Sequence, residues 1–218
     1  MAQKTDAQNV LALRGRFIVL DGPEGCGKST QAKMLGERLA KAGAPAALVR
    51  DPGTTRIGER IRDILLDALH IEMAMRCEML LYMAARAQMM REMILPALAA
   101  GKVVVCDRFV SSTLAYQLGG DGLTAEEIRG VGQVAMSGRW PDLTIILDMA
   151  VEESFARVKR EKDRIEQRPA EYHQRVRRSF LAQTEADPAG YRVIAADRRP
   201  DEVHEDVWRA VVQFAERG

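Results

Sequence analysis

A phosphate-binding loop is the feature of this sequence that most restricts its fold. Residues 22–29 read Gly-Pro-Glu-Gly-Cys-Gly-Lys-Ser and match the pattern G-x-x-x-x-G-K-[ST]. An apolar run at 16–21 predicts a strand before the loop, and apolar residues at helical spacing over 28–42 predict a helix after it. Glycines let backbone N–H groups turn toward phosphate oxygens, and the helix start adds the positive end of its dipole. This context favours a nucleotide-binding unit over a glycine-rich turn that binds nothing.

Individual residues of the loop have expected roles. Lys28 should reach the β- and γ-phosphates of ATP, and the Ser29 hydroxyl should bind Mg²⁺. We interpret Cys26 as a small residue at a variable position of the loop rather than as a redox switch. The expected ATP-binding residues are Gly22, Pro23, Glu24, Gly25, Cys26, Gly27, Lys28, Ser29 and Thr30.

Further apolar runs predict strands, and the segments between them predict helices. Parallel strands separated by helices imply an α/β fold with a five-stranded parallel sheet flanked by helices on both faces. Ligands of such sheets bind at the carboxyl ends of the strands. We expect a single domain over 15–218 and a polar N-terminal tail over 1–14. The other expected strands are 45–50, 102–107, 142–148 and 191–195, and the other expected helices are 57–69, 75–100, 111–118, 124–137, 151–159, 170–184 and 200–216.

Charge and cysteine content argue against several classes of protein. The 32 basic residues nearly balance the 31 acidic ones, so the net charge of +1 gives no reason to expect a nucleic-acid or membrane partner. The cysteines, Cys26, Cys77 and Cys106, lack metal-ligand spacing and suit free thiols in a reducing cytosol. No apolar run approaches the roughly 18 residues that span a bilayer. We therefore expect a cytoplasmic protein whose partners are small molecules.

The phosphate loop does not fix the reaction, because GTPases, motor ATPases and kinases share it. The sequence has no Asn-Lys-x-Asp guanine-reading motif. A small-molecule kinase also needs a site for the acceptor's own phosphate. Asp107 and Arg108 end the third predicted strand, where the Arg can clamp a phosphate and the Asp can hold the Mg²⁺ hydration shell. An isolated Asp-Arg pair would favour a structural ion pair, so the surrounding sequence must decide.

Four segments carry a resemblance to a known family. They read Asp-Gly-Pro-Glu-Gly-Cys-Gly-Lys-Ser-Thr at 21–30, Leu-Leu-Tyr-Met-Ala-Ala-Arg-Ala-Gln at 80–88, Cys-Asp-Arg-Phe-Val-Ser-Ser-Thr-Leu-Ala-Tyr-Gln at 106–117 and Asp-Arg-Ile-Glu at 163–166. Their order and spacing along 16–210 resemble bacterial-type thymidylate kinases of the lid-arginine subtype. The resemblance implies the fold of P-loop nucleoside-monophosphate kinases. It also implies phosphorylation of dTMP to dTDP with MgATP as the donor, a step in dTTP synthesis.

The resemblance also implies roles for residues of the acceptor site. Arg108 would bind the acceptor phosphate, and Glu24 would approach the sugar 3′-hydroxyl. Tyr82 would stack on thymine, and Arg86, one helical turn later on the same face, would donate to a thymine carbonyl. Tyr116 would pack near the sugar C2′ and disfavour a ribose. The implied dTMP-binding residues are Glu24, Arg50, Pro52, Tyr82, Arg86, Arg108, Thr113, Tyr116 and Gln117; the catalytic ones are Lys28, Asp107, Arg108, Arg160 and Arg164; and those for Mg²⁺ are Ser29 and Asp107, partly through water.

A basic segment after the fourth predicted strand is the expected lid, at about 157–170. Some thymidylate kinases carry a catalytic Arg inside the phosphate loop, but Gly25 stands there in this sequence. The cation must then come from the lid, where Arg160 and Arg164 are the first candidates and Arg157 and Lys159 the reserves. A solvated helix face is the alternative, because acidic residues are interleaved with the basic ones. Placement after a strand and the match at 163–166 favour a mobile lid that closes over ATP.

The sequence departs from the family pattern around the second predicted strand and the loop entry. Asp21 stands where the family commonly has Glu, which can shift how the Mg²⁺ shell is held. Thr54 replaces the second Gly of the usual Arg-Glu-Pro-Gly-Gly-Thr. The family has a cis-proline in this loop, so the resemblance implies a cis Asp51–Pro52 bond.

Assembly and exact activity leave alternatives open. Seven of the 11 methionines fall between Met73 and Met93, and flexible side chains suit both core gaps and adaptable interfaces. Thymidylate kinases are typically homodimers packed through helices, so we predict a two-fold helical interface that includes part of this segment. Core packing of all seven is the alternative. The alternatives to dTMP kinase activity are another nucleotide or deoxynucleoside kinase and a non-catalytic nucleotide-binding switch.

Overall fold

A computed structural model describes residues 10–159 and 161–217. Its centre is a sheet of parallel strands in the order β2–β3–β1–β4–β5, which confirms the predicted five-stranded parallel sheet. Two of the three inner strands, β1 and β3, are buried at every residue, as expected of apolar strands covered on both faces. The strands are β1 (Phe17–Asp21), β2 (Ala46–Arg50), β3 (Val103–Asp107), β4 (Leu143–Asp148) and β5 (Tyr191–Ala195).

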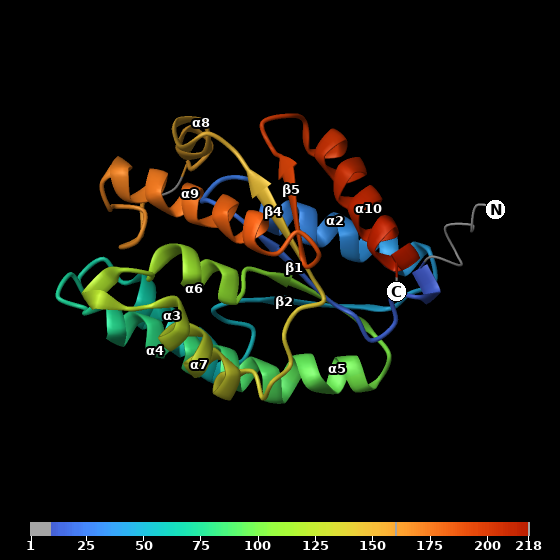
Figure 1. The fold of residues 1–218 in the computed structure, drawn as a ribbon, viewed down its shortest axis with the longest axis horizontal. Helices are drawn as coiled ribbons and strands as arrows, with labels where there is room; N and C mark the ends of the chain where they lie inside the picture. The colour runs from blue at the N-terminus through green and yellow to red at the C-terminus, as the bar shows by residue number, and fades with distance from the viewer. Residues whose placement is uncertain (1–9, 160, 218) are drawn as a thin grey trace.

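Helices cover both faces of this sheet, as Figure 1 shows. On one face, α2 and α10 pack on the strands through buried residues such as Leu35 and Trp208. On the other face, α4 and α6 pack through residues such as Met83 and Leu114. The helices are α2 (Lys28–Lys41), α3 (Arg56–Leu66), α4 (Met75–Met89), α5 (Leu95–Ala99), α6 (Val110–Tyr116), α7 (Ala125–Ala135), α8 (Val151–Ala156), α9 (Ala170–Ala186) and α10 (Pro200–Arg217), with a 3₁₀ turn at Gly120–Gly122.

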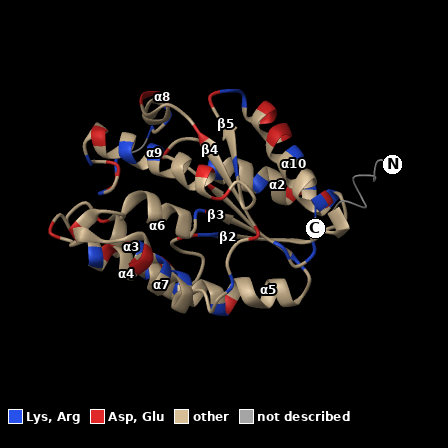
Figure 2. Ribbon diagram, viewed as in Figure 1, with Lys and Arg blue, Asp and Glu red and all other residues tan. Residues whose placement is uncertain are grey.

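Charged residues gather where the strands end. Asp21, Arg50, Asp107 and Asp148 are the last residues of β1, β2, β3 and β4. The strand registers place Leu20 and Arg50 beside Asp107, so these ends lie together at one edge of the sheet. Figure 2 shows the charged residues at this edge and along the outer surfaces of the helices. The edge is where ligands of parallel sheets bind.

The packed domain begins earlier than predicted. Val10 and Leu13 are fully buried in the core beside α2 and α10. The Leu13 N–H donates to the Val10 carbonyl over 3.1 Å, so both side chains lie on one face of a helical turn. The prediction of a polar tail is therefore wrong for residues 10–14. Residues 1–9 lie outside the described residues.

The long helix predicted over 75–100 is interrupted. It consists of α4, a π-helical turn at Met90–Ile94 and α5. Pro96 has no backbone N–H to donate to the preceding turn, which is a regular cause of such irregularities. By contrast, α7 begins as predicted, because Thr124 and Glu127 form both hydrogen bonds of a capping box.

Most of the clustered methionines belong to the core. Met93 is 38% exposed, and Met73 and Met75 are half-buried. Core packing therefore accounts for the four fully or nearly fully buried ones, Met79, Met83, Met89 and Met90.

Across 10–159 and 161–217, none of the helices combines the length and the apolar character needed to cross a membrane.

Candidate active site

The phosphate loop connects β1 to α2 and is shaped by its glycines. Gly22, Gly25 and Gly27 have φ values of 135°, 71° and 94°, which residues with side chains rarely adopt. A Cβ atom would stand 2.4 Å from the Leu147 carbonyl oxygen at Gly22 and 2.1 Å from that of Ser154 at Gly25. The loop is therefore packed against the end of β4 and against α8, and only glycine fits these two positions.

Lys28, the first residue of α2, turns its amine back into the loop. Its Nζ donates to the backbone oxygens of Gly22, over 3.1 Å, and of Pro23. The Cys26 sulfur lies 3.5 Å from the same Nζ. Burial raises the pKa of the Cys26 thiol despite this neighbouring cation. A raised pKa disfavours the thiolate that a redox switch needs, so Cys26 suits the expected role of a small packing residue.

Two expected metal-binding groups meet beside the loop. The Ser29 hydroxyl donates a hydrogen bond to Oδ2 of Asp107. Both residues line a cavity of about 710 Å³ at the carboxyl edge of the sheet. Mg²⁺ prefers oxygen ligands and usually keeps water and phosphate oxygens besides one or two protein groups. This hydroxyl–carboxylate pair fits that requirement.

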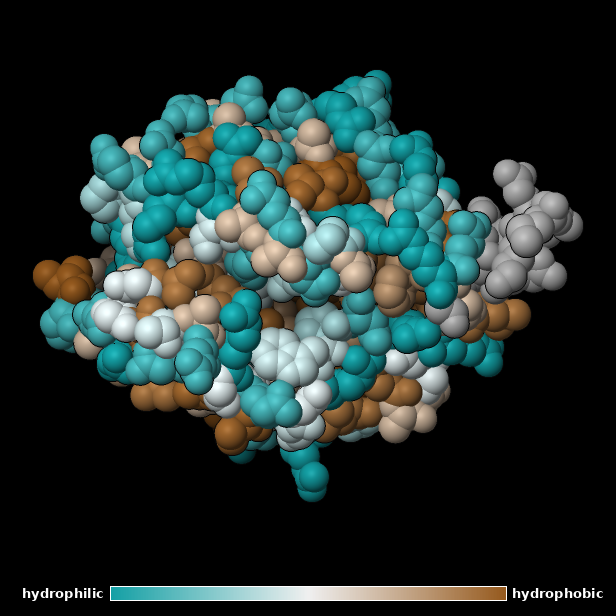
Figure 3. Space-filling view, in the orientation of Figure 1, coloured by the Kyte–Doolittle hydropathy of each residue, from teal (hydrophilic) through white to brown (hydrophobic). Residues whose placement is uncertain are grey.

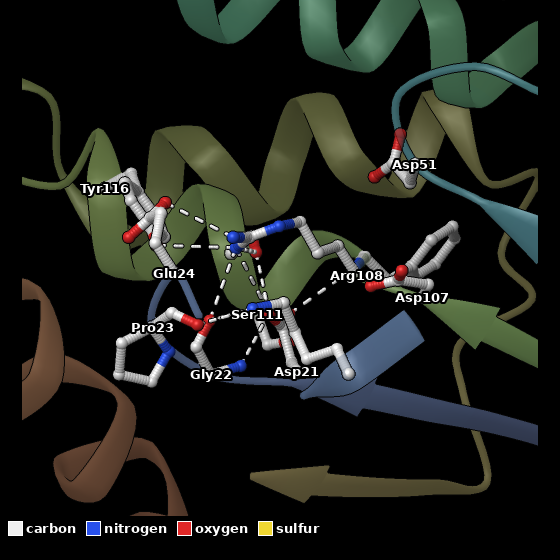
Figure 4. A network of polar contacts seen from close by, with 12 residues as sticks. Asp21, Gly22, Pro23, Glu24, Asp51, Asp107, Arg108, Ser111 and Tyr116 are labelled. Atoms are coloured by element: carbon white, nitrogen blue, oxygen red, sulfur yellow. Dashed lines mark hydrogen bonds and ion pairs between the residues drawn. The ribbon is translucent and has the colours of Figure 1, made fainter. Parts of the chain in front are cut away.

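Arg108 lies between the phosphate loop and α6, as Figure 4 shows. Its φ of 68° is uncommon for a residue with a side chain. One terminal nitrogen lies 3.3 Å from the Gly22 carbonyl oxygen and 3.2 Å from the Ser112 hydroxyl. The buried Asp21 accepts hydrogen bonds from the Ser111 and Ser112 hydroxyls, over 2.5 and 2.7 Å. Asp21 thus ties the end of β1 to the start of α6 and supports the position of Arg108.

Glu24 brings a carboxylate of the loop into the same cluster. Its Oε1 accepts hydrogen bonds from the Tyr116 hydroxyl, over 2.6 Å, and from Arg108, over 3.2 Å, and its Oε2 lies 3.8 Å from Nδ1 of His173. Burial alone would raise the pKa of Glu24, but Arg108, Lys28 and Tyr116 more than compensate and hold this pKa below its usual range. Glu24 is therefore a fixed carboxylate that can accept from a further hydroxyl group.

The other end of the cavity is lined from α4. Arg86 is fully buried, and its guanidinium donates to Oδ2 of Asp51 through Nε, at 2.9 Å, and through one terminal nitrogen. The same terminal nitrogen lies 3.4 Å from the Thr113 hydroxyl. Tyr82 lines the cavity one turn before Arg86. The Asp51–Pro52 bond is cis, as predicted. An aromatic ring with a few fixed polar groups suits a flat base.

The structure brings most of the predicted site residues together. Three residues of the phosphate loop, Gly22, Pro23 and Cys26, do not line the cavity. The predicted residues that line the cavity are Glu24, Gly25, Gly27, Lys28, Ser29, Thr30, Arg50, Pro52, Tyr82, Arg86, Asp107, Arg108, Thr113, Tyr116 and Gln117.

Arg164 is the exception. It was expected to be a free cation of the lid, but it is 7% exposed and does not line the cavity. Its guanidinium donates to Oε2 of Glu78, over 2.6 Å, and to the Leu65 carbonyl, over 3.0 Å. A buried ion pair fixes this side chain, so in this conformation its role is structural. Arg157 and Lys159, the two reserve cations, do line the cavity, and Arg160 lies outside the described residues.

Sequence reasoning missed several residues that shape the site. Glu78 lies four residues before Tyr82 and eight before Arg86, so helical spacing could have placed it on the same face. Arg62 lines the cavity from α3 and donates to the Pro52 carbonyl over 3.1 Å. His173 approaches Glu24 from α9, but no local pattern in the sequence connects these two residues.

Comparisons with known proteins identify a family for this chain. The family model described as Thymidylate kinase matches residues 20–207. The chain is 48% identical over 201 residues to the thymidylate kinase of Pelotomaculum thermopropionicum, covering 91% of this chain and 93% of that protein. It is 41% identical to the thymidylate kinase of Deinococcus radiodurans, covering 94% of this chain and 98% of that protein. It is 42% identical to the thymidylate kinase of Halothermothrix orenii, covering 91% of this chain and 97% of that protein. The chain therefore belongs to the thymidylate kinase family.

Proposed function

We propose that the chain phosphorylates dTMP to dTDP with MgATP, and that each end of the cavity holds one substrate. The observation that carries this proposal is the position of Arg108. Its guanidinium stands beside the phosphate loop, 3.3 Å from the Gly22 carbonyl, in a cavity that continues to Tyr82 and Arg86. A nucleoside monophosphate with its base at Arg86 would place its phosphate near Arg108. ATP would lie with its phosphates in the loop.

The chemistry needs positioning and charge rather than a general base. An oxygen of the dTMP phosphate attacks the γ-phosphorus of ATP, the bond to the β–γ bridging oxygen breaks, and ADP leaves. Arg108 holds the attacking phosphate, and Lys28 stabilises the negative charge that develops on the transferred phosphoryl group. Ser29 and Asp107 would hold Mg²⁺, which neutralises charge on the ATP phosphates when bound. Glu24 accepts a hydrogen bond from the sugar 3′-hydroxyl.

We further propose that residues 157–170 form a lid over ATP. Arg157 and Lys159 line the cavity, and Arg157 also donates to the Ala196 carbonyl over 3.1 Å. Arg160 is the candidate for the cation that covers the transferred phosphoryl group. The alternative interpretation, a solvated basic face, would leave kcat unchanged when Arg160 is replaced.

A coupled assay of ADP release separates the candidate functions. Wild-type protein with MgATP is given dTMP, dUMP, dCMP, dGMP, AMP or thymidine in turn. We expect the highest kcat/KM for dTMP. Preference for thymidine would indicate a deoxynucleoside kinase, preference for another monophosphate would indicate a different nucleotide kinase, and ATP binding without turnover of any acceptor would indicate a binding module.

We also propose a cytoplasmic homodimer that packs through α3 and α4. Ile57 and Ile64 on α3 are seven residues apart on one face and are 50% and 44% exposed, and Leu80 on the neighbouring α4 is 52% exposed. Figure 3 shows hydrophobic surface along the lower edge of the molecule. Light scattering at micromolar concentration should give a dimer mass, and Ile64→Glu should give a monomer. A wild-type monomer would contradict the proposal.

A further inference from the structure

One buried carboxylate joins the base end of the cavity to the lid segment. Glu78 on α4 is fully buried, and its two oxygens have different partners. Oε1 accepts a hydrogen bond from Nε2 of Gln117 over 2.7 Å. Oε2 accepts from Arg164 over 2.6 Å and from Arg168 over 2.7 Å. The two guanidinium groups compensate the buried charge of Glu78, which would otherwise be costly.

Glu78 determines which way the Gln117 amide points. A carboxylate can only accept hydrogen bonds, so the amide must turn its NH₂ group toward Glu78. The opposite orientation would bring two acceptor oxygens together. The Gln117 side chain is 2% exposed and lines the cavity, and its Oε1 has no hydrogen-bond partner among the described residues. The acceptor end of Gln117 is thus left for a donor supplied by a ligand.

Arg86 is also held by a buried carboxylate, Asp51, but it presents hydrogen-bond donors where Gln117 presents an acceptor. Asp51 accepts from its Nε and one terminal nitrogen, and the other terminal nitrogen lies 3.1 Å from the Met83 sulfur. A guanidinium has N–H donors only, so Arg86 can offer the base nothing but donors. A base read by Arg86 and Gln117 must therefore offer an acceptor next to a donor. Thymine offers its 4-carbonyl beside the imino N3–H. Cytosine offers the reverse, an amino group beside an N3 acceptor.

We propose that Glu78 is a positioning residue that sets pyrimidine specificity by holding Gln117 with its Oε1 toward the imino N–H of the base. This rests on the proposed function, since it takes dTMP as the ligand of the cavity. Loss of the Glu78 charge would let Gln117 turn and present its NH₂ group. Such a turn would weaken binding of thymine and remove a mismatch with cytosine.

The test compares Glu78→Gln with the wild-type protein. The new amide has the same shape and can donate to Oε1 of Gln117, which frees Gln117 to turn. We expect the ratio of kcat/KM for dTMP to that for dCMP to fall at least tenfold, with the KM for ATP unchanged. Glu205→Gln is the matched control, because Glu205 also pairs with an arginine, Arg38, but at the surface. An unchanged ratio in folded Glu78→Gln would overturn the proposal.

A double-mutant cycle shows whether Glu78 acts through Gln117. Gln117→Met removes the amide and should itself lower the dTMP-to-dCMP ratio. Adding Glu78→Gln to Gln117→Met should then change the ratio less than threefold. An equal fall in both backgrounds would mean that Glu78 acts by another route, and the proposal would be wrong.

A ligand series tests the same contact in the wild-type protein, and so does not depend on the folding of any variant. Calorimetry without ATP compares dTMP, dCMP and dTMP methylated at N3. We expect N3-methylation to weaken binding at least tenfold, and binding within threefold of dTMP would overturn the proposal. Because this readout needs no turnover, it separates a failure of base recognition from a failure of the proposed phosphoryl transfer, which would show as dTMP binding without ADP release.

Discussion

Tyr116 donates its hydroxyl to Oε1 of Glu24 over 2.6 Å, and Arg108 lies within 3.4 Å of both oxygen atoms. The three side chains come from α6, the phosphate loop and the end of β3. Each restrains the other two, so the group expected at the sugar and the group expected at the acceptor phosphate share one hydrogen-bonded cluster. Removing a single hydroxyl or cation should therefore affect use of the acceptor more than binding of ATP.

Tyr116→Phe should lower kcat/KM for dTMP by about tenfold. The change removes one hydrogen bond to a carboxylate, and a tenfold loss corresponds to about 1.4 kcal/mol, close to the 1.5–3 kcal/mol typical of such bonds. Steady-state kinetics with varied dTMP measures the effect. Tyr191→Phe is the control, since Tyr191 does not line the cavity and its hydroxyl contacts Gln183, over 3.5 Å, and Thr144. Equal kinetics for Tyr116→Phe and wild type would show that the hydroxyl does not position Glu24.

Arg108→Ala should abolish efficient use of dTMP. The guanidinium supplies the charge that places the attacking phosphate, so we expect kcat/KM for dTMP to fall at least about 100-fold, or about 2.7 kcal/mol. Arg108→Lys should recover only part of the loss, because an ammonium lacks the planar fork. The measurement is ADP release at saturating ATP. Near-normal kcat/KM in Arg108→Ala would mean that the acceptor phosphate binds elsewhere.

Local patterns predicted the sheet and the position of the site. Each apolar run was short and bounded by turn residues, and parallel strands bring their carboxyl ends together. Gly22 and Arg108 are far apart in sequence, yet each directly follows a strand, so the predicted parallel sheet implies their proximity. Ser29 and Asp107 were both expected to bind Mg²⁺, and the structure places them in hydrogen-bond contact.

Side-chain partners that do not directly follow a strand could not be predicted. The sequence alone does not distinguish one basic residue of 157–170 from another. In the structure, Arg164 pairs with the buried carboxylate of Glu78, which is 86 residues away. Nothing in the local pattern shows which cation a distant carboxylate will hold. The N-terminal error had a different cause: residues 10–13 are apolar, but a run of four residues is too short to distinguish a packed turn from a tail.

Gly25→Ala should disrupt the phosphate loop. Gly25 has a φ of 71°, and a Cβ atom would stand 2.1 Å from the Ser154 carbonyl oxygen, so the loop or α8 must move. We expect at least tenfold weaker ATP binding by calorimetry and a lower melting temperature. Gly43→Ala is the matched control, because Gly43 has a φ of 87° but nothing within 4 Å of the added atom. Equal effects of the two substitutions would show that the steric contact at Gly25 is easily relieved.

Arg164→Ala and Arg160→Ala should have different consequences. Arg164 lies in a buried pair with Glu78, so its loss should reduce the free energy of unfolding by about 2–3 kcal/mol; Arg168 still pairs with Glu78, which keeps the cost below the 3–5 kcal/mol of a fully broken pair. Urea denaturation measures this. Arg160→Ala, by contrast, should lower kcat at least tenfold at saturating ATP and dTMP. If neither variant loses tenfold in kcat, the lid does not supply the catalytic cation.

Acidification should destabilise the protein through two buried histidines. Burial is the main cause that lowers the pKa of His173 and of His204 below the usual 6.5. The unfolded chain then binds protons more readily than the folded one, so the free energy of unfolding is retained above about pH 6.5 and falls as the pH drops below it. Each histidine can contribute up to about 1.4 kcal/mol per pH unit. Urea denaturation at pH 7.5, 6.5 and 5.5 measures the slope.

Variants identify the histidines responsible for this pH dependence. His173→Gln combined with His204→Gln should flatten the dependence between pH 7.5 and 5.5, because neither position then takes up a proton on unfolding. Carboxylates with a lowered pKa, such as Glu24, lose their contribution only at lower pH. A slope that persists in the double variant would show that groups other than these two histidines take up the protons.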